Sequence, residues 1–170
     1  DSEAPPIVLL HGHGEDLHTW NQLVKHLIED FRVIRFDLRR HGLTGPALDN
    51  QYGIESYVSD LSLVIEHLGI NSCDLVGHSM GGRIAVKFTM EISHRQFMSN
   101  SYNSYFNVGS NEEISIKLLV NLLEKLFNHN FKIKYDSSMP NGTLRKKLNS
   151  NRLNKLGWKS KIKLKKGLAD

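Results

Sequence analysis

Leu75-Val76-Gly77-His78-Ser79-Met80-Gly81-Gly82 contains the strongest structural signal in the first half of this chain. A mostly apolar run leads into a glycine, a serine and two more glycines, and a helix-compatible segment over residues 83–90 follows. This order predicts a strand, a sharp turn and a helix, with Ser79 at the apex in the G-x-S-x-G pattern typical of a nucleophile elbow. Glycines two residues before and two after the serine are expected because the turn leaves no room for side chains there.

Alternating strand and helix patterns come before this turn. Short apolar or alternating runs predict strands over residues 7–10, 31–36 and 73–76. Apolar residues at helical spacing predict amphipathic helices over residues 20–28 and 57–68. Strands that alternate with helices are typical of a doubly wound, parallel α/β sheet, which binds ligands at the carboxyl ends of its strands.

The charge distribution divides the chain into two parts. Residues 1–90 hold 7 Lys and Arg against 12 Asp and Glu, whereas residues 91–170 hold 15 against 6. Such a break predicts two segments of different character. The basic run over residues 159–166 alternates with Ile162 and Leu164, which favours an ordinary solvated surface over a nucleic-acid partner.

Composition excludes several other classes of protein. No apolar run approaches the roughly 20 residues that span a bilayer, so no membrane partner is expected. Cys73 is the only cysteine, which excludes an internal disulfide and a cysteine-rich metal site, and a cytoplasmic location is expected. We predict neither a metal nor a cofactor. The chain begins with Asp1 instead of Met, which suggests a fragment.

Three motifs in the first half resemble those of the α/β-hydrolase superfamily. PIVLLHGHG is similar to its oxyanion strand and loop, FDLRRHGLT to its D-x-R-x-H-G turn, and DLVGHSMGGRIAVKF to its elbow and following helix. The resemblance covers about residues 5–88. It implies that Ser79 is the nucleophile, that the backbone N–H groups of His13 and Met80 form the oxyanion hole, and that the substrate is a small ester-like molecule.

The resemblance also implies a carboxylate and a histidine downstream of the serine. The histidines after Ser79 are His94 and His129, and neither lies in a suitable turn. The downstream acids do not follow apolar strands either: they are Glu91, Glu112, Glu113, Glu124, Asp136 and Asp170. We therefore predict that the acid–base half of a triad is missing and that the site is catalytically incomplete. Asp37 precedes the serine and is expected to have a structural role, as His11 is in shaping its loop.

The second half has a different pattern. Residues 105–127 predict a strand, a Gly-Ser turn and an amphipathic helix with Ser115 as its N-cap, and alternation over residues 131–135 predicts another strand. A small α/β segment is the expected result.

Three motifs of this second half resemble the C-terminal substrate-binding region of GDP-L-fucose synthase. They are NVGSNEEISIK, PNGTLRK and RLNKLGW, and the resemblance runs from about residue 88 to the end. It implies that Arg145 and Lys146 lie near a nucleotide-sugar diphosphate, with Asn141 as a further substrate contact. No G-x-x-G-x-x-G loop or Tyr-x-x-x-Lys pair accompanies these motifs, so no dinucleotide cofactor is expected.

The two resemblances predict a chimera of a partial hydrolase core over residues 1–88 and an epimerase-like segment over residues 89–170. Three functions stay open at this point. They are an esterase-type serine hydrolase that lacks its triad acid and histidine, a GDP-sugar-binding remnant, and a fusion product with no function.

Overall fold

The computed structural model describes residues 3–96, 106–140 and 142–169, with the backbone alone for residues 92–96. The chain divides into two compact units, Asp1–Asn103 and Ser104–Asp170.

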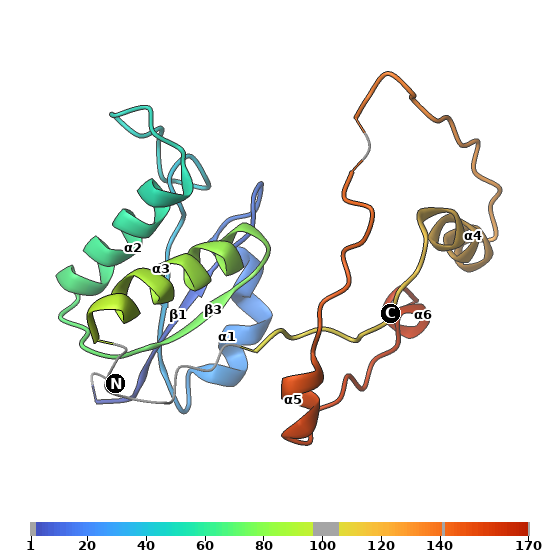
Figure 1. Ribbon diagram of the computed structural model, residues 1–170. Helices are drawn as coiled ribbons and strands as arrows, with labels where there is room; N and C mark the ends of the chain where they lie inside the picture. The colour runs from blue at the N-terminus through green and yellow to red at the C-terminus, as the bar shows by residue number, and fades with distance from the viewer. Residues whose placement is uncertain (1–2, 97–105, 141, 170) are drawn as a thin grey trace. The chain divides into compact units, whose positions relative to one another are not determined.

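The first unit is built on a three-stranded parallel sheet (Figure 1). Its strands are β1 (Pro6–Leu10), β2 (Arg32–Arg35) and β3 (Asp74–Gly77), in the order β2-β1-β3. β1 is central, with Val8 opposite Ile34 of β2 and Leu75 of β3. The predicted parallel sheet is therefore confirmed.

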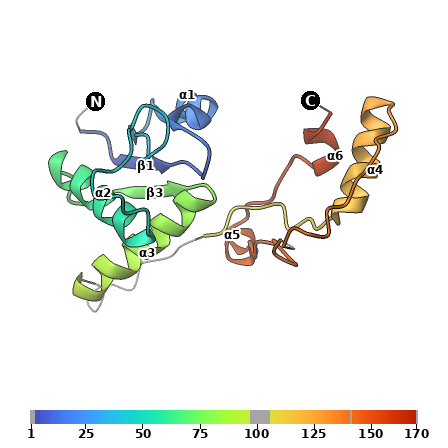
Figure 2. The same cartoon turned by 90° about the horizontal axis from the view of Figure 1, so that it is seen from above.

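Helices lie on both faces of this sheet. A 3₁₀ turn, η1 (Leu17–Trp20), leads into α1 (Asn21–Leu27) on one face, and α2 (Ile54–His67) and α3 (Met80–Gln96) lie on the other (Figures 1 and 2). This doubly wound arrangement follows the predicted order of elements. The sequence-based boundary at residue 88 lies within α3.

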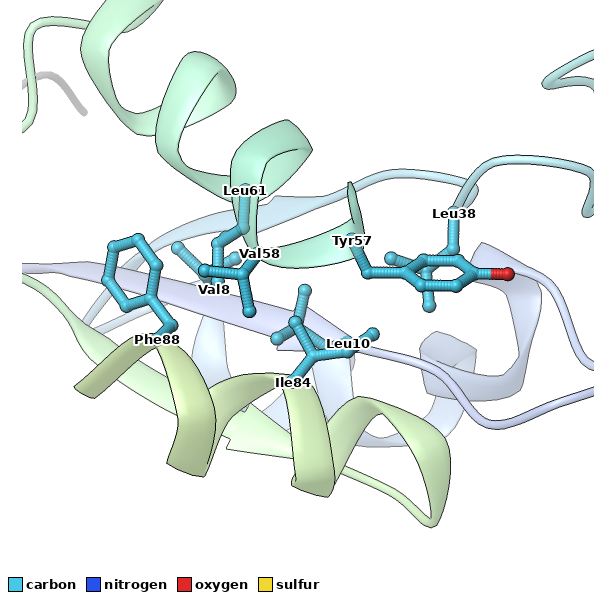
Figure 3. Close-up of a cluster of buried hydrophobic side chains, with 8 residues drawn as sticks. All are labelled: Val8, Leu10, Leu38, Tyr57, Val58, Leu61, Ile84 and Phe88. Atoms are coloured by element: carbon cyan, nitrogen blue, oxygen red, sulfur yellow. The ribbon is translucent and has the colours of Figure 1, made fainter. Parts of the chain in front are cut away.

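The core of this unit forms between the sheet and the pair α2 and α3. Alternate residues of the central strand, Val8 and Leu10, point toward the helices, and neither is exposed to solvent. The other members of the cluster come from both helices and from the turn after β2 (Figure 3): Leu38, Tyr57, Val58, Leu61, Ile84 and Phe88. Burial of these apolar side chains is the main force that holds α2 and α3 against the sheet.

The second unit contains α4 (Ile116–Phe127), α5 (Asn151–Lys155) and α6 (Leu164–Gly167). The side chain of Ser115 accepts a hydrogen bond from the Leu118 N–H at 3.2 Å, which confirms the predicted N-cap. α4 ends at Asn128, whose left-handed conformation stops the helix.

The predicted strands of the second unit are not present in the part of it that the structure describes. Residues 131–135 have no strand partner, and their apolar members Phe131, Ile133 and Tyr135 are exposed. Residues 106–110 are also irregular, and Tyr105 lies outside the described residues. The alternating pattern was misleading because a strand is stable only when a neighbouring strand pairs with it. The prediction of an α/β segment was wrong in this respect.

Within the described residues, no helix has the length and apolar character to cross a membrane.

Candidate active site

Ser79 lies at the bend between β3 and α3. Its φ is 52°, in the left-handed region that residues with a Cβ atom rarely adopt, and its side chain is exposed. The Arg83 N–H donates to the Ser79 carbonyl at 3.3 Å, so the helix begins immediately after the bend. A strained and exposed serine between a strand and a helix is the geometry of a nucleophile elbow.

The two glycines that flank the serine are required by packing. A Cβ atom on Gly77 would lie less than 3 Å from the backbone of Gly81 and Gly82. A Cβ atom on Gly81 would overlap the Leu10 and His11 carbonyl groups in the same way. The prediction that this turn leaves no space for side chains is confirmed.

The predicted oxyanion loop follows the neighbouring strand β1 and contacts the elbow. The His78 N–H donates to the Leu10 carbonyl at 3.0 Å, and Gly81 packs on the same segment. His13 is exposed, and its ring lies edge-on to His41 with 5.5 Å between centroids. The structure thus brings the loop that contains His13 beside the elbow that contains Ser79.

Met80 is the first residue of α3. The N–H groups in the first turn of a helix have no partner within the helix, and they carry the positive end of its dipole. The Met80 N–H therefore lies at the positive end of α3, one residue after Ser79.

His11 holds the base of the oxyanion loop. The ring is fully buried; its Nε2 accepts from the Leu38 N–H at 3.0 Å, and its Nδ1 lies 2.8 Å from the Gly12 carbonyl. Because Nε2 accepts a hydrogen bond, the proton must be on Nδ1, which donates to Gly12. The predicted loop-shaping role of His11 is confirmed.

Glu15 was not predicted from the sequence as a site residue. Its carboxylate accepts from the Gly12 N–H at 2.7 Å and lies 3.0 Å from Nδ1 of His78, the residue before Ser79. The hydrogen bond from Gly12 is the main cause that lowers the pKa of Glu15; His78 lowers it too, while burial opposes the change. A glutamate three residues after the loop glycine is the only signal in the sequence, and it does not reveal the contact with His78.

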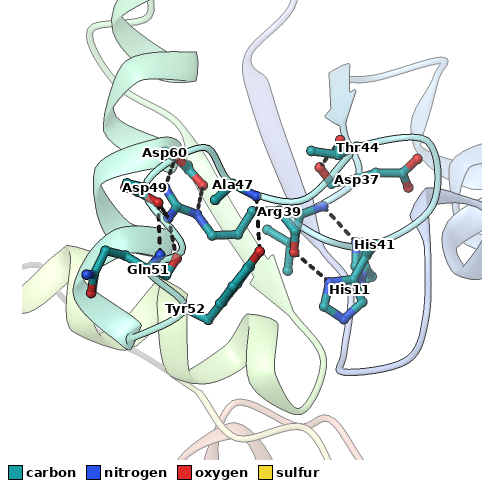
Figure 4. A network of polar contacts seen from close by, with 11 residues as sticks. His11, Asp37, Arg39, His41, Thr44, Ala47, Asp49, Gln51, Tyr52 and Asp60 are labelled. Atoms are coloured by element: carbon teal, nitrogen blue, oxygen red, sulfur yellow. Dashed lines mark hydrogen bonds and ion pairs between the residues drawn. The ribbon is translucent and has the colours of Figure 1, made fainter.

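Asp37 is held by hydrogen bonds from two backbone N–H groups and from Thr44, which lies beside it in Figure 4. Its carboxylate accepts from the Leu17 N–H at 2.8 Å and the Leu43 N–H at 2.9 Å, and Thr44 donates to its carbonyl. Burial raises the pKa of Asp37, but these backbone hydrogen bonds outweigh burial, so the pKa is lower than usual. The predicted structural role is confirmed.

Arg39, in the same turn, fastens that turn to α2 (Figure 4). Its guanidinium donates two hydrogen bonds to the carboxylate of Asp60, at 2.6 and 2.7 Å, and a further bond reaches the Gln51 carbonyl. The bond with Asp60 is the main cause that raises the pKa of Arg39, against the opposing effect of burial. The pairing joins residues 21 positions apart, which no local pattern in the sequence predicts.

The remaining predicted residues lie in the second unit or outside the described residues. His129 is exposed in the second unit, with its ring 5.2 Å from that of Phe131, and the side chain of His94 lies outside the described residues.

Arg145 is paired with Glu113 through two bonds of 2.6 Å, and Lys146 is exposed. Asn141 lies outside the described residues. Within the described part of the chain, no group of three or more His, Cys, Asp or Glu could hold a metal ion.

Comparison with known proteins places this geometry in a family. The sequence model of the alpha/beta hydrolase fold matches residues 5–95. A karrikin insensitive 2 receptor from Petunia hybrida is 35% identical, and the match covers 59% of this chain and 39% of the relative. A probable esterase from Oryza sativa subsp. japonica is 40% identical, and that match covers 46% of this chain and 30% of the relative. The chain thus spans about a third of the length of the curated relatives it matches.

Solved structures agree with these matches. A carboxylesterase of the thaumarchaeon Nitrososphaera gargenis is 33% identical with a TM-score of 0.52, over 54% of this chain and 34% of that one. An enol-lactonase from Burkholderia xenovorans is 35% identical with a TM-score of 0.50, and the match covers 55% of this chain and 35% of the enol-lactonase. Because the family match covers more than half of the chain, and because the strand, bend and helix around Ser79 are in place, the chain belongs to the alpha/beta hydrolase fold family.

Proposed function

We propose that the chain contains the nucleophile half of an esterase-type serine hydrolase site. The observation that carries this proposal is the left-handed, exposed Ser79, held between β3 and α3 by glycines that tolerate no side chain. Such an arrangement presents a hydroxyl to a ligand at the carboxyl end of a parallel sheet. The substrate class is a small ester or a related acyl compound.

The chemistry follows from the groups beside the serine. The Ser79 oxygen attacks the carbonyl carbon of the ester, and the carbonyl oxygen becomes an oxyanion. The backbone N–H groups of His13 and Met80 donate to that oxyanion, and the dipole of α3 adds positive potential. The hydroxyl proton must leave to a base as the new bond forms.

The family order puts the acid and the histidine after the serine, and no histidine lies among the described side chains that follow Ser79 in the first unit. We therefore propose that the triad acid and histidine are missing from this chain. General-base catalysis contributes about 10²–10⁴-fold in rate, so Ser79 should react that much more slowly than the serine of a complete site.

A fluorophosphonate probe tests the proposal. The folded chain should be labelled slowly and at Ser79 alone, as judged by mass spectrometry of the peptide that contains residue 79. Ser79→Ala should abolish labelling, whereas a substitution of an exposed serine on α2, Ser59→Ala, should leave it unchanged. Folded protein that takes up no label after prolonged exposure would contradict the proposal.

A second candidate function belongs to the other unit. The exposed cationic run that contains Arg145 and Lys146 favours binding of a GDP-sugar diphosphate, as its resemblance to GDP-L-fucose synthase implies. The Arg145 guanidinium is already paired with Glu113, so a diphosphate would have to displace that carboxylate. Calorimetric titration with a GDP-sugar should detect binding that survives Ser79→Ala and is lost in Lys146→Ala. If no heat of binding is detected, the fusion-product alternative is favoured for this segment.

A further inference from the structure

The carboxylate of Glu15 lies between the oxyanion loop and the elbow. It accepts from the Gly12 N–H at 2.7 Å on the loop side, and its two oxygens lie 3.0 and 3.1 Å from Nδ1 of His78 on the elbow side. No other described side chain bonds to both segments. Glu15 therefore joins the residue before Ser79 to the loop that supplies the second oxyanion donor.

The loop is closed by a second hydrogen bond in the opposite direction. The Glu15 N–H donates to the Gly12 carbonyl at 3.3 Å, which makes residues 12–15 a turn. Gly14, at the third position of that turn, has a φ of 76°, as glycine does in a type II turn. His13 occupies the second position, so the direction of its N–H depends on how firmly the turn is held.

Gly12 leaves the space in which these contacts form. A Cβ atom there would lie 3.0 Å from a carboxylate oxygen of Glu15 and 3.1 Å from Nδ1 of His78. Both atoms are at the ends of flexible side chains. Alanine at this position would therefore push the two side chains aside without obstructing the backbone.

We propose that Glu15 is a positioning residue of the oxyanion hole: its carboxylate fastens the turn that contains His13 to the elbow that contains Ser79. This inference rests on the proposed hydrolase function, because an oxyanion hole has a role only if Ser79 attacks a substrate. The bonding partners of the Glu15 carboxylate are Gly12 and His78, on either side of the site, so its role is to position other groups. It acts by holding the donor in place before the reaction begins, which is where preorganised hydrogen bonds gain their effect.

Charge makes this fastening strong. A hydrogen bond from a backbone N–H to a carboxylate is stronger than one between neutral groups, and the same bond lowers the pKa of Glu15, so the group stays ionised at neutral pH. Glutamine at this position would keep one acceptor oxygen for Gly12, but it would lose the charge and replace the other oxygen, which lies 3.0 Å from His78, by an amide nitrogen. Alanine would lose both.

The test compares Glu15→Ala and Glu15→Gln in the full chain by two measurements. Glu15→Ala should speed hydrogen exchange of the Gly12 amide about tenfold, measured by NMR, because the amide loses its acceptor. It should slow fluorophosphonate labelling of Ser79 by about tenfold, since loss of an oxyanion donor altogether costs about 10²–10³. Glu15→Gln should restore most of the protection of the Gly12 amide and most of the labelling rate of Ser79. Glu66→Ala removes an exposed carboxylate on α2 and should change neither.

Gly12→Ala provides an independent route to the same result. It leaves the Glu15 carboxylate in the protein but displaces it from the Gly12 N–H, so exchange and labelling should both change in the direction seen for Glu15→Ala. Because the φ of Gly12 is not in the left-handed region, loss of folding is not expected from this substitution.

The possible outcomes separate this inference from the proposed function. If the Gly12 amide exchanges equally in wild type and Glu15→Ala, or if labelling of Ser79 is unchanged while exchange accelerates, the positioning role is overturned. If the wild type is not labelled at all, the hydrolase proposal fails and the positioning role fails with it, whatever the exchange of Gly12. Rescue of both measurements by Glu15→Gln supports the role, because a purely steric contact would not need the acceptor oxygen.

Discussion

Ser79 has a left-handed backbone conformation, which is unfavourable for a residue with a Cβ atom. A non-glycine residue in the left-handed region is strained by about 1–2 kcal/mol, which the surrounding packing must offset. Ser79→Gly should therefore raise the free energy of unfolding by about 1 kcal/mol, as measured by urea denaturation, and should abolish labelling by the fluorophosphonate. Ser79→Ala retains the Cβ atom and should not be stabilised. A Ser79→Gly variant no more stable than Ser79→Ala would argue against strain at the bend.

Asp37 makes stability depend on pH. Its pKa in the folded chain is lower than its ordinary value near 3.8, because backbone hydrogen bonds outweigh burial, so the unfolded chain binds more protons in acid. Its contribution to stability is therefore complete above that ordinary value and is lost as the pH falls through the folded pKa.

Asp37→Asn tests this dependence. The variant should lose about 1–3 kcal/mol at pH 7, since an amide offers one acceptor oxygen to two N–H groups. Urea denaturation at a series of pH values between about 2 and 7 measures the free energy of unfolding of wild type and variant. Plotted against pH, the two free energies should converge at low pH. Curves that stay parallel down to the lowest pH would show that Asp37 is not the titrating group.

At the scale of elements, α2 offers a matched pair of leucines. Leu61 is completely buried against the sheet, whereas Leu63, two residues away, is 60% exposed. Leu61→Ala should lower the free energy of unfolding by about 2–5 kcal/mol, through lost burial and the cavity left behind. Leu63→Ala should change it by no more than about 0.5 kcal/mol. Urea denaturation followed by circular dichroism measures both, and equal losses would contradict the packing of α2 in the structure.

At the scale of the whole molecule, the two units should differ in protection from hydrogen exchange. β1 is paired on both sides and contains the most deeply buried residues, so its amides should exchange only when the whole first unit opens. α4 has no buried residue, and its amides should exchange about a hundredfold faster. Peptide-level exchange by mass spectrometry measures this, and equal protection of Pro6–Leu10 and Ile116–Phe127 would contradict it.

Local patterns in the sequence were sufficient for most of the first unit. The positions of the three strands, of the helices between them and of the bend at Ser79 could be predicted from apolar spacing and from the placement of glycines, because the pattern that marks each of them lies within a few neighbouring residues. Ser115 at the start of α4 was predictable for the same reason: a cap bonds to a residue three positions away.

Contacts between distant segments were decided by the tertiary structure alone. Glu15 meets His78 across 63 positions and Arg39 meets Asp60 across 21, and in neither case does the local sequence name the partner. The same reason explains the wrong strand at residues 131–135, where alternation satisfied the local requirement for a strand but no neighbouring strand paired with it. Neighbouring residues in the chain therefore specify the bend that presents Ser79, whereas the side chains that hold this bend in place meet only when folding brings distant segments together.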